Sequence, residues 1–136
     1  MRPLRAFIVE NSPVIRENLA GTLEELANVE VIGSAADEAS AVHWMSRQAC
    51  GPADVVIVDV FLNSGTGLGV LRAAQRLGVV ARRIVLTNYA TEDMRRRCVS
   101  LGAERVFDKC HQLDEFISYC AGLGGKPLAP LLPDGY

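Results

Sequence analysis

Several kinds of segment are missing from this 136-residue sequence. No apolar run approaches the roughly 18 residues that a membrane-spanning helix needs, and the first eleven residues carry no long apolar stretch or small-residue cleavage site. An excess of charge of one sign is also missing, because the formal net charge is only -2. These absences predict a cytosolic protein with neither nucleic acid nor a membrane as a direct partner.

Cysteine and histidine are too sparse to predict a metal centre. The sequence has four cysteines with no C-x-x-C pair, and two histidines. Scattered cysteines in a reducing compartment are usually small buried hydrophobic residues, and we interpret Cys50, Cys98, Cys110 and Cys120 in this way. The neighbours Cys110 and His111 would form a zinc site only if a further ligand folded beside them.

The composition that is present is typical of one globular domain. Hydrophobic residues make up 49% of the chain and charged residues 22%, which argues against disorder and against a coiled coil. We expect the domain to span residues 1–122. Residues 123–136 are rich in Gly and Pro and predict a flexible or extended tail, too short for an output domain.

Five short apolar runs have the length of strands, and helical patterns separate them. The run VVIV is apolar at successive positions, which is typical of a strand covered on both faces. Five strands alternating with five helices predict a doubly wound α/β domain with a parallel sheet and right-handed crossovers. The expected strands are residues 6–9, 29–32, 55–58, 84–86 and 106–107.

The helices are predicted from caps and from apolar positions at helical spacing. Ser12 and Thr91 are the expected N-caps of the first and fourth helices, and the third begins near Gly67 with Leu68, Leu71 and Ala74 inward. The remaining apolar positions predicted to face the core are Ile15, Leu19, Leu23 and Leu26 in the first helix, Val42 and Met45 in the second, and Leu113, Phe116, Ile117 and Cys120 in the fifth.

Polar residues stand at the carboxyl ends of four predicted strands. Glu10 and Asn11 follow the first, Asp59 the third, Thr87 ends the fourth and Lys109 follows the fifth. Because the carboxyl ends of parallel strands meet at one edge of a sheet, we expect these side chains to lie together. An aspartate nucleophile, oxygen ligands for Mg²⁺, a hydroxyl and a fixed cation suit phosphoryl transfer to a carboxylate.

These residues lie in the segments FIVENSPVIREN, VVIVDVFLNSGTGLGVL, IVLTN and GAERVFDK. From residue 4 to about residue 122 the chain resembles bacterial response-regulator receiver domains, in particular the stand-alone kind without an output domain. The resemblance implies a flavodoxin-like fold with five helices and a five-stranded parallel sheet of order 2-1-3-4-5. It also implies a two-component phosphorelay in which a sensor histidine kinase or phosphotransfer protein phosphorylates Asp59.

The resemblance further implies the role of each site residue. Thr87 would be the switch hydroxyl, and Lys109 the cation that binds the phosphoryl group. An altered surface near the fourth helix would signal to a separate effector protein, so we expect a signalling phosphoacceptor rather than an enzyme. The implied Mg²⁺ ligands are Glu10, Asn11, Asp59 and the main-chain carbonyl of Phe61.

Four positions depart from the family pattern. Asn11 replaces an acid, and the lost charge is expected to cost about 1 to 2 kcal/mol, or about tenfold in Mg²⁺ affinity. Asn88 replaces a small residue, so the entrance is expected to be narrower. Val106 replaces the switch aromatic, and Phe107 would point to the other face of the sheet. Cys110 replaces a proline, so we expect a trans peptide bond before it.

Two further features allow alternative interpretations. Phe61 and Tyr89 occupy positions that flank the phosphoryl group in the family, which predicts slow dephosphorylation; the alternative is that both rings only cover loop backbone. Arg95, Arg96 and Arg97 are either a solvated helix face or part of a docking surface. Because successive helical residues point about 100° apart, the three cannot all face one partner.

Two other functions compete with the phosphoacceptor. One is a pseudo-receiver, which uses the same fold as a phosphorylation-independent binding module; Asn11, Asn88 and Val106 would be its signs. The other is a flavin or nucleotide enzyme. Residues 11–18, NSPVIREN, offer no Gly- and hydroxyl-rich phosphate cradle, and no G-x-x-x-x-G-K-[ST] motif is present, so both cofactors are disfavoured.

Overall fold

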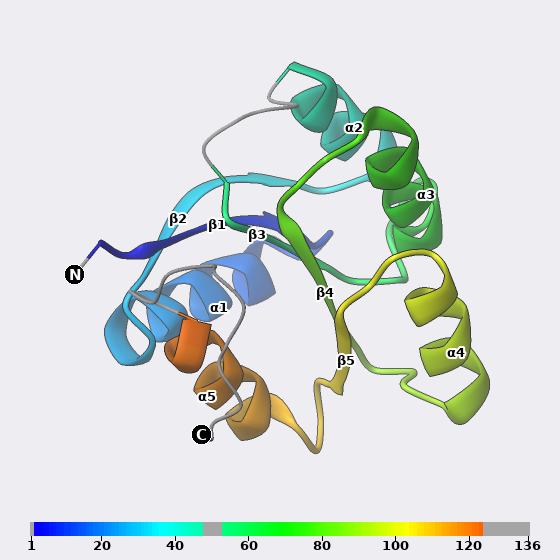
Figure 1. The fold of residues 1–136 in the computed structure, drawn as a ribbon. Coiled ribbons are helices and arrows are strands. Elements are labelled where there is room, and N and C mark those ends of the chain that lie inside the picture. The colour runs from blue at the N-terminus through cyan, green and yellow to red at the C-terminus, as the bar shows by residue number, and fades with distance from the viewer. Residues whose placement is uncertain (1, 48–52, 124–136) are drawn as a thin grey trace, which may run out of the picture.

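A computed structural model describes residues 2–47 and 53–123. Five strands pair in parallel in the order β2-β1-β3-β4-β5, which confirms the predicted sheet (Figure 1). Most strands are longer than the apolar runs that predicted them, because residues outside those runs continue the same backbone pairing. Their bounds are β1 Leu4–Val9, β2 Val29–Ala35, β3 Val55–Val58, β4 Arg82–Thr87 and β5 Arg105–Asp108.

Helices cover both faces of this sheet. Helices α1 (Pro13–Leu26) and α5 (Leu113–Leu123) lie on one face; α2 (Glu38–Arg47), α3 (Gly67–Leu77) and α4 (Glu92–Ser100) lie on the other (Figure 1). Strand β3 is buried throughout, with alternate residues packed into the cores on opposite faces. The prediction of a strand covered on both sides is therefore confirmed.

Hydroxyl side chains cap the starts of three helices. Ser12 Oγ accepts a hydrogen bond from the Ile15 amide at 3.2 Å, and Thr91 Oγ1 accepts one from the Met94 amide at 3.1 Å, as predicted. The third cap was not predicted: Thr66 Oγ1 accepts from the Gly69 amide at 3.1 Å. Each cap satisfies an amide that has no partner within its own helix.

Four positions predicted to be buried are exposed, namely Ile15, Leu26, Cys110 and Leu113. Ile15 is 41% exposed and Leu113 is 39% exposed, because both lie near helix starts, where they border a depression between α1 and α5. Leu26 is 61% exposed because it is the last residue of α1, beyond the buried Leu23. Cys98 and Cys120 are buried as predicted, Cys110 is exposed, and Cys50 lies outside the described residues.

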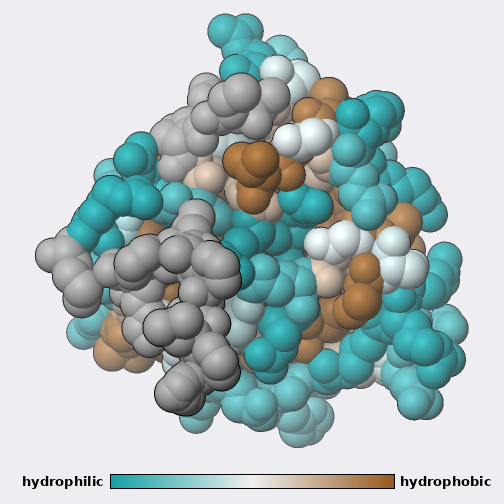
Figure 2. Space-filling model, in the orientation of Figure 1, coloured by the Kyte–Doolittle hydropathy of each residue, from teal (hydrophilic) through white to brown (hydrophobic). Residues whose placement is uncertain are grey.

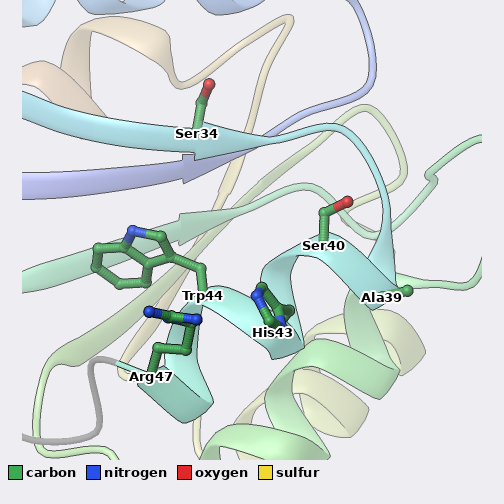
Figure 3. Close-up of a pocket in the computed structure, with 6 residues that line it drawn as sticks. All are labelled: Ser34, Ala39, Ser40, His43, Trp44 and Arg47. Carbon is green, nitrogen blue, oxygen red and sulfur yellow. The ribbon is translucent and has the colours of Figure 1, made fainter.

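The single tryptophan fixes α2 against the edge of the sheet. Trp44 stacks on Phe7 with ring centroids 3.8 Å apart and an interplanar angle of 15°. A Cβ atom at Gly33 would lie 3.1 Å from the Phe7 ring and 3.5 Å from Trp44 Nε1, so the absence of a side chain there leaves room for the stack. Figure 3 shows Trp44 in a depression beside β2, with His43 and Arg47 on the same helix.

The surface shown in Figure 2 is mixed in polarity. Hydrophobic side chains form separate patches among hydrophilic ones on the part of this face that is not grey. No helix within residues 2–47 and 53–123 combines the length and the apolar character needed to cross a membrane.

Candidate functional site

Three charged residues meet at the carboxyl edge of the sheet. Lys109 Nζ lies 2.6 Å from Glu10 Oε1 and 2.9 Å from Asp59 Oδ2. These residues follow β5, β1 and β3, and they meet because parallel strands end at the same edge. The sequence expectation that the three would lie together is confirmed, whereas their roles stay predictions.

Burial decides the electrostatics of this group. Asp59 is 8% exposed and Glu10 is 3% exposed. Burial raises the pKa of Asp59, and the Lys109 ammonium opposes that shift without cancelling it. For Lys109, burial lowers the pKa, but hydrogen bonds to Glu10 and Asp59 outweigh it and leave the pKa above its ordinary value. Lys109 is therefore charged at neutral pH and compensates two buried carboxyl groups.

Thr87 ends β4 beside this group and is fully buried. Its Oγ1 accepts a hydrogen bond from the Tyr89 amide at 3.3 Å, and its carbonyl accepts one from the Lys109 amide at 2.9 Å. The ends of β4 and β5 are therefore joined next to the lysine. A displacement of either strand end would move the other.

Asn11 completes a set of oxygen donors suited to a divalent cation. One terminal atom of its amide lies 3.2 Å from both Glu10 Oε2 and the Phe61 carbonyl oxygen, and the other lies 3.0 Å from Asn63 Oδ1. With its NH₂ group inward, Asn11 donates to both oxygens. With its carbonyl inward, three oxygens converge, and oxygen atoms are the ligands that Mg²⁺ prefers. The donor set fits this ion.

Carboxylates alone do not make this a metal site. Over the described part of the chain, no three His, Cys, Asp or Glu side chains are grouped so that they could hold a metal ion. The carboxylates of Glu10 and Asp59 would therefore need the Asn11 amide oxygen and the Phe61 carbonyl to coordinate a divalent cation. Asn63 was not predicted from the sequence, because only the fold brings it to Asn11.

Two aromatic rings stand beside the buried group. Phe61 and Tyr89 lie with ring centroids 4.7 Å apart, and they are 49% and 59% exposed. Their loops follow Asp59 and Thr87. Asn88 is exposed and its Oδ1 lies 3.5 Å from Cys110 Sγ, so it contacts the next loop; whether it narrows the entrance stays a prediction.

The residues of β5 are placed as expected. Val106 packs into the core under α4, whereas Phe107 packs on the opposite face of the sheet against Phe116, with ring centroids 5.6 Å apart. Phe107 is therefore in a different layer and does not replace the missing switch aromatic. The peptide bond before Cys110 is trans, which confirms that expectation.

Arg95 joins three segments on this side of the site. Its guanidinium donates to the Ala90 carbonyl at 3.0 Å, the Val106 carbonyl at 2.7 Å and Gln112 Oε1 at 2.6 Å. Gln112 Oε1 also accepts from the Asp108 amide at 2.9 Å. Arg95 therefore connects the β4–α4 loop, β5 and the β5–α5 loop. The sequence showed only a run of three arginines.

The rest of the arginine run is arranged differently. Arg96 forms longer contacts of 3.7 and 3.8 Å with the exposed Glu92 and Asp93 on its own helix. The run is therefore not one docking surface, because Arg95 points inward and Arg96 lies along the exposed side of α4.

A carboxylate from α2 reaches the loop that follows Asp59. Glu38 Oε1 accepts a hydrogen bond from the Thr66 amide at 2.9 Å, and the Glu38 amide donates to the Ser64 carbonyl at 3.1 Å. The sequence gives no signal for this contact, because the two segments are 28 residues apart.

Residues 6–121 match the family model of the response regulator receiver domain. The chain belongs to this family. Receiver domains are the phosphorylation-linked modules of two-component systems, and the sheet order found here is that of the flavodoxin-like receiver fold.

Curated relatives carry receiver domains within longer proteins. The chain is 41% identical over 71 residues to protein-glutamate methylesterase/protein-glutamine glutaminase 5 of Anaeromyxobacter dehalogenans, covering 52% of this chain and 19% of that one. It is 34% identical over 85 residues to the nitrate/nitrite response regulator protein NarP of Escherichia coli, covering 62% of this chain and 38% of that one. The chain thus spans less than half the length of these two relatives.

A solved structure has the same fold. A response regulator protein from Burkholderia pseudomallei, described with a phosphorylated aspartic acid, a calcium ion and citrate, superposes with a TM-score of 0.70. The two sequences are 21% identical, and the match covers 85% of this chain and 65% of that chain. At this identity the likeness shows the fold alone.

Proposed function

We propose that this receiver domain accepts a phosphoryl group on Asp59 in a Mg²⁺-dependent reaction. The observation that carries the proposal is the buried Asp59 carboxylate held 2.9 Å from the Lys109 ammonium. Lys109 also contacts Glu10 at 2.6 Å, so one cation orients both carboxylates. The phosphoryl donor would be a sensor histidine kinase or a phosphotransfer protein.

The chemistry requires a carboxylate nucleophile and compensation of the phosphoryl charge. An Asp59 oxygen forms a bond to phosphorus while the bond from phosphorus to the donor's leaving atom breaks, and that electron pair stays with the leaving group. Lys109 is placed to neutralise the phosphoryl oxygens, and Thr87 is the nearby hydroxyl donor. Mg²⁺, held by Glu10, Asn11, Asp59 and the Phe61 carbonyl, would supply further positive charge there.

The output would be an altered surface. The Lys109 amide is bonded to the Thr87 carbonyl, and Arg95 joins the loops after both strands. A shift of Thr87 toward a phosphoryl group would therefore reach α4 and the start of α5, where a separate effector protein would recognise it.

The proposal is tested by incubating the protein with acetyl phosphate and Mg²⁺ and measuring its intact mass. We expect an added phosphoryl group that depends on Mg²⁺ and is absent from Asp59→Asn. The matched control is Asp37→Asn, a partly exposed acid immediately before α2 that lies outside the group. An unchanged mass for the wild-type protein with acetyl phosphate, together with an unchanged Phe61 and Tyr89 environment on addition of beryllofluoride and Mg²⁺, would favour a phosphorylation-independent binding module.

The same assay tests the Phe61 and Tyr89 pair. If the two rings limit access of water to the phosphoryl group, Phe61→Ala together with Tyr89→Ala shortens the lifetime of the modified protein. An unchanged lifetime would indicate that the two rings only cover the loop backbone.

A further inference from the structure

We propose that Glu38 is a positioning residue, which holds the β3–α3 loop so that the Phe61 carbonyl stays available to Mg²⁺. This inference rests on the proposed function, because it assigns the cation to the site beside Asp59. Glu38 does not belong to the group around Lys109. It reaches the same loop from the opposite side, from the first turn of α2.

The β3–α3 loop is closed by one short bridge. Phe61 and Thr66 form an isolated antiparallel pair, and the Gly67 amide donates to the Val60 carbonyl at 2.8 Å. In such a pair, with the hydrogen bond made by the flanking residues, the polar groups of the paired residues point outward on opposite sides. The Phe61 carbonyl therefore points toward Asn11, and the Thr66 amide points away from it, toward α2.

Glu38 satisfies this outward amide. Its Oε1 accepts from Thr66 at 2.9 Å, while its own amide donates to the Ser64 carbonyl at 3.1 Å. One residue thus binds the loop through both its side chain and its backbone. Because Thr66 is also the N-cap of α3, the same contact fixes where that helix begins.

Two glycines leave the space that the Glu38 carboxylate occupies. A Cβ atom at Gly65 would lie 2.5 Å from Glu38 Oε1, and one at Gly69 would come closer still to Oε2. Gly65 also has φ +75, a conformation that residues with side chains rarely adopt. The carboxylate therefore lies on a surface without side chains, and any larger residue there would displace it.

The consequence concerns metal affinity. The Phe61 carbonyl is at one end of a six-residue span whose other end, Thr66, is held by Glu38. If that hold is lost, the carbonyl is no longer preorganised and part of the binding free energy is used to order the loop.

The experiment compares three variants at one position. Glu38→Gln removes the charge and keeps an acceptor oxygen, whereas Glu38→Asp keeps the charge and is one methylene too short to reach Thr66. Glu38→Ala removes both. Mg²⁺ affinity is measured by titration of the metal-free proteins followed by NMR, and exchange of the Thr66 amide is measured in the absence of metal.

We expect Asp and Ala at position 38 to weaken Mg²⁺ binding about tenfold and to accelerate Thr66 amide exchange by a similar factor, with Gln close to wild type. Asp37→Ala is the matched control, because Asp37 Oδ1 caps the same helix by accepting from the Ser40 amide at 2.8 Å and leaves the loop untouched. That control should change stability but not Mg²⁺ affinity.

Other outcomes overturn the inference. If Gln weakened binding and Asp did not, Glu38 would act through long-range charge instead of position. Equal affinity in all variants, in a wild-type protein that does bind Mg²⁺, would overturn this inference alone. A wild-type protein that bound no Mg²⁺ would overturn both it and the proposed function.

Discussion

The two sides of Asp59 are held by charged residues of opposite sign. On the side of α4 and α5, Arg95 donates three hydrogen bonds that join three segments. On the side of α3, Glu38 accepts one hydrogen bond from Thr66 and occupies space left by glycines. A guanidinium carries five donors, so one arginine can join several main-chain carbonyls, whereas the carboxylate depends on the fit of its surroundings. The β3–α3 loop, which Glu38 holds, should therefore be easier to displace than the segments that Arg95 joins.

Removing the Lys109 ammonium, which lies between the two sides, should have the largest effect on the free energy of unfolding. Lys109→Met leaves the buried carboxyl groups of Glu10 and Asp59 with main-chain amide donors but without a countercharge, and it should lower the free energy of unfolding by about 3 to 5 kcal/mol. Urea denaturation without Mg²⁺ measures this loss. Added Mg²⁺ should recover part of it, and a variant as stable as wild type would show that the lysine is not the main compensating charge.

Arg95→Met tests the strength of the α4 and α5 side. It leaves the Ala90 and Val106 carbonyls without the donor that binds them, and it should cost about 2 kcal/mol of unfolding free energy. Arg96→Met is the control, because its contacts of 3.7 and 3.8 Å are exposed and should be worth at most about 0.5 kcal/mol. A loss for Arg95→Met as small as that for Arg96→Met would show that Arg95 does not strengthen the α4 and α5 side.

Gly69→Ala tests the fit on the α3 side. The new methyl group would collide with the Glu38 carboxylate, so we expect a loss of about 1 to 2 kcal/mol despite the better helix propensity of alanine. In a Glu38→Ala background the sign should reverse, and the same change should stabilise the protein slightly. Thermal denaturation of the four proteins measures this coupling, and additive effects would contradict it.

The smallest effect concerns the charge of Asp59 itself. Burial raises the pKa of Asp59, so its ionised form is less favourable in the folded protein than in the unfolded chain. The stability that protonated Asp59 contributes is fully present below the ordinary pKa of an aspartate. It is lost as pH rises through the raised pKa of Asp59 in the folded protein. Asp59→Asn should therefore be more stable than wild type at neutral pH without metal. The difference should narrow as pH falls through the raised pKa of Asp59 toward the ordinary pKa of an aspartate, and a constant or widening difference would contradict the sign.

Residues at strand ends could be predicted from the sequence, whereas residues that act across the fold could not. Glu10, Asp59, Thr87 and Lys109 each follow or end an apolar run, and parallel pairing alone brings such positions to one edge. Arg95 looked like one of three surface arginines. Its inward direction depends on where α4 packs against β5, which no local pattern reports.

The sequence by itself determined the alternation of strands and helices, the two-sided burial of VVIV and the order of the site residues. Each depends on hydrophobic periodicity and on caps, which are local properties. Only the tertiary structure decided that Ile15 and Leu113 are exposed, that Asn63 meets Asn11 and that Glu38 holds the loop after Asp59. Those contacts join residues far apart in the chain, so their energies depend on packing between elements and not on the residues alone.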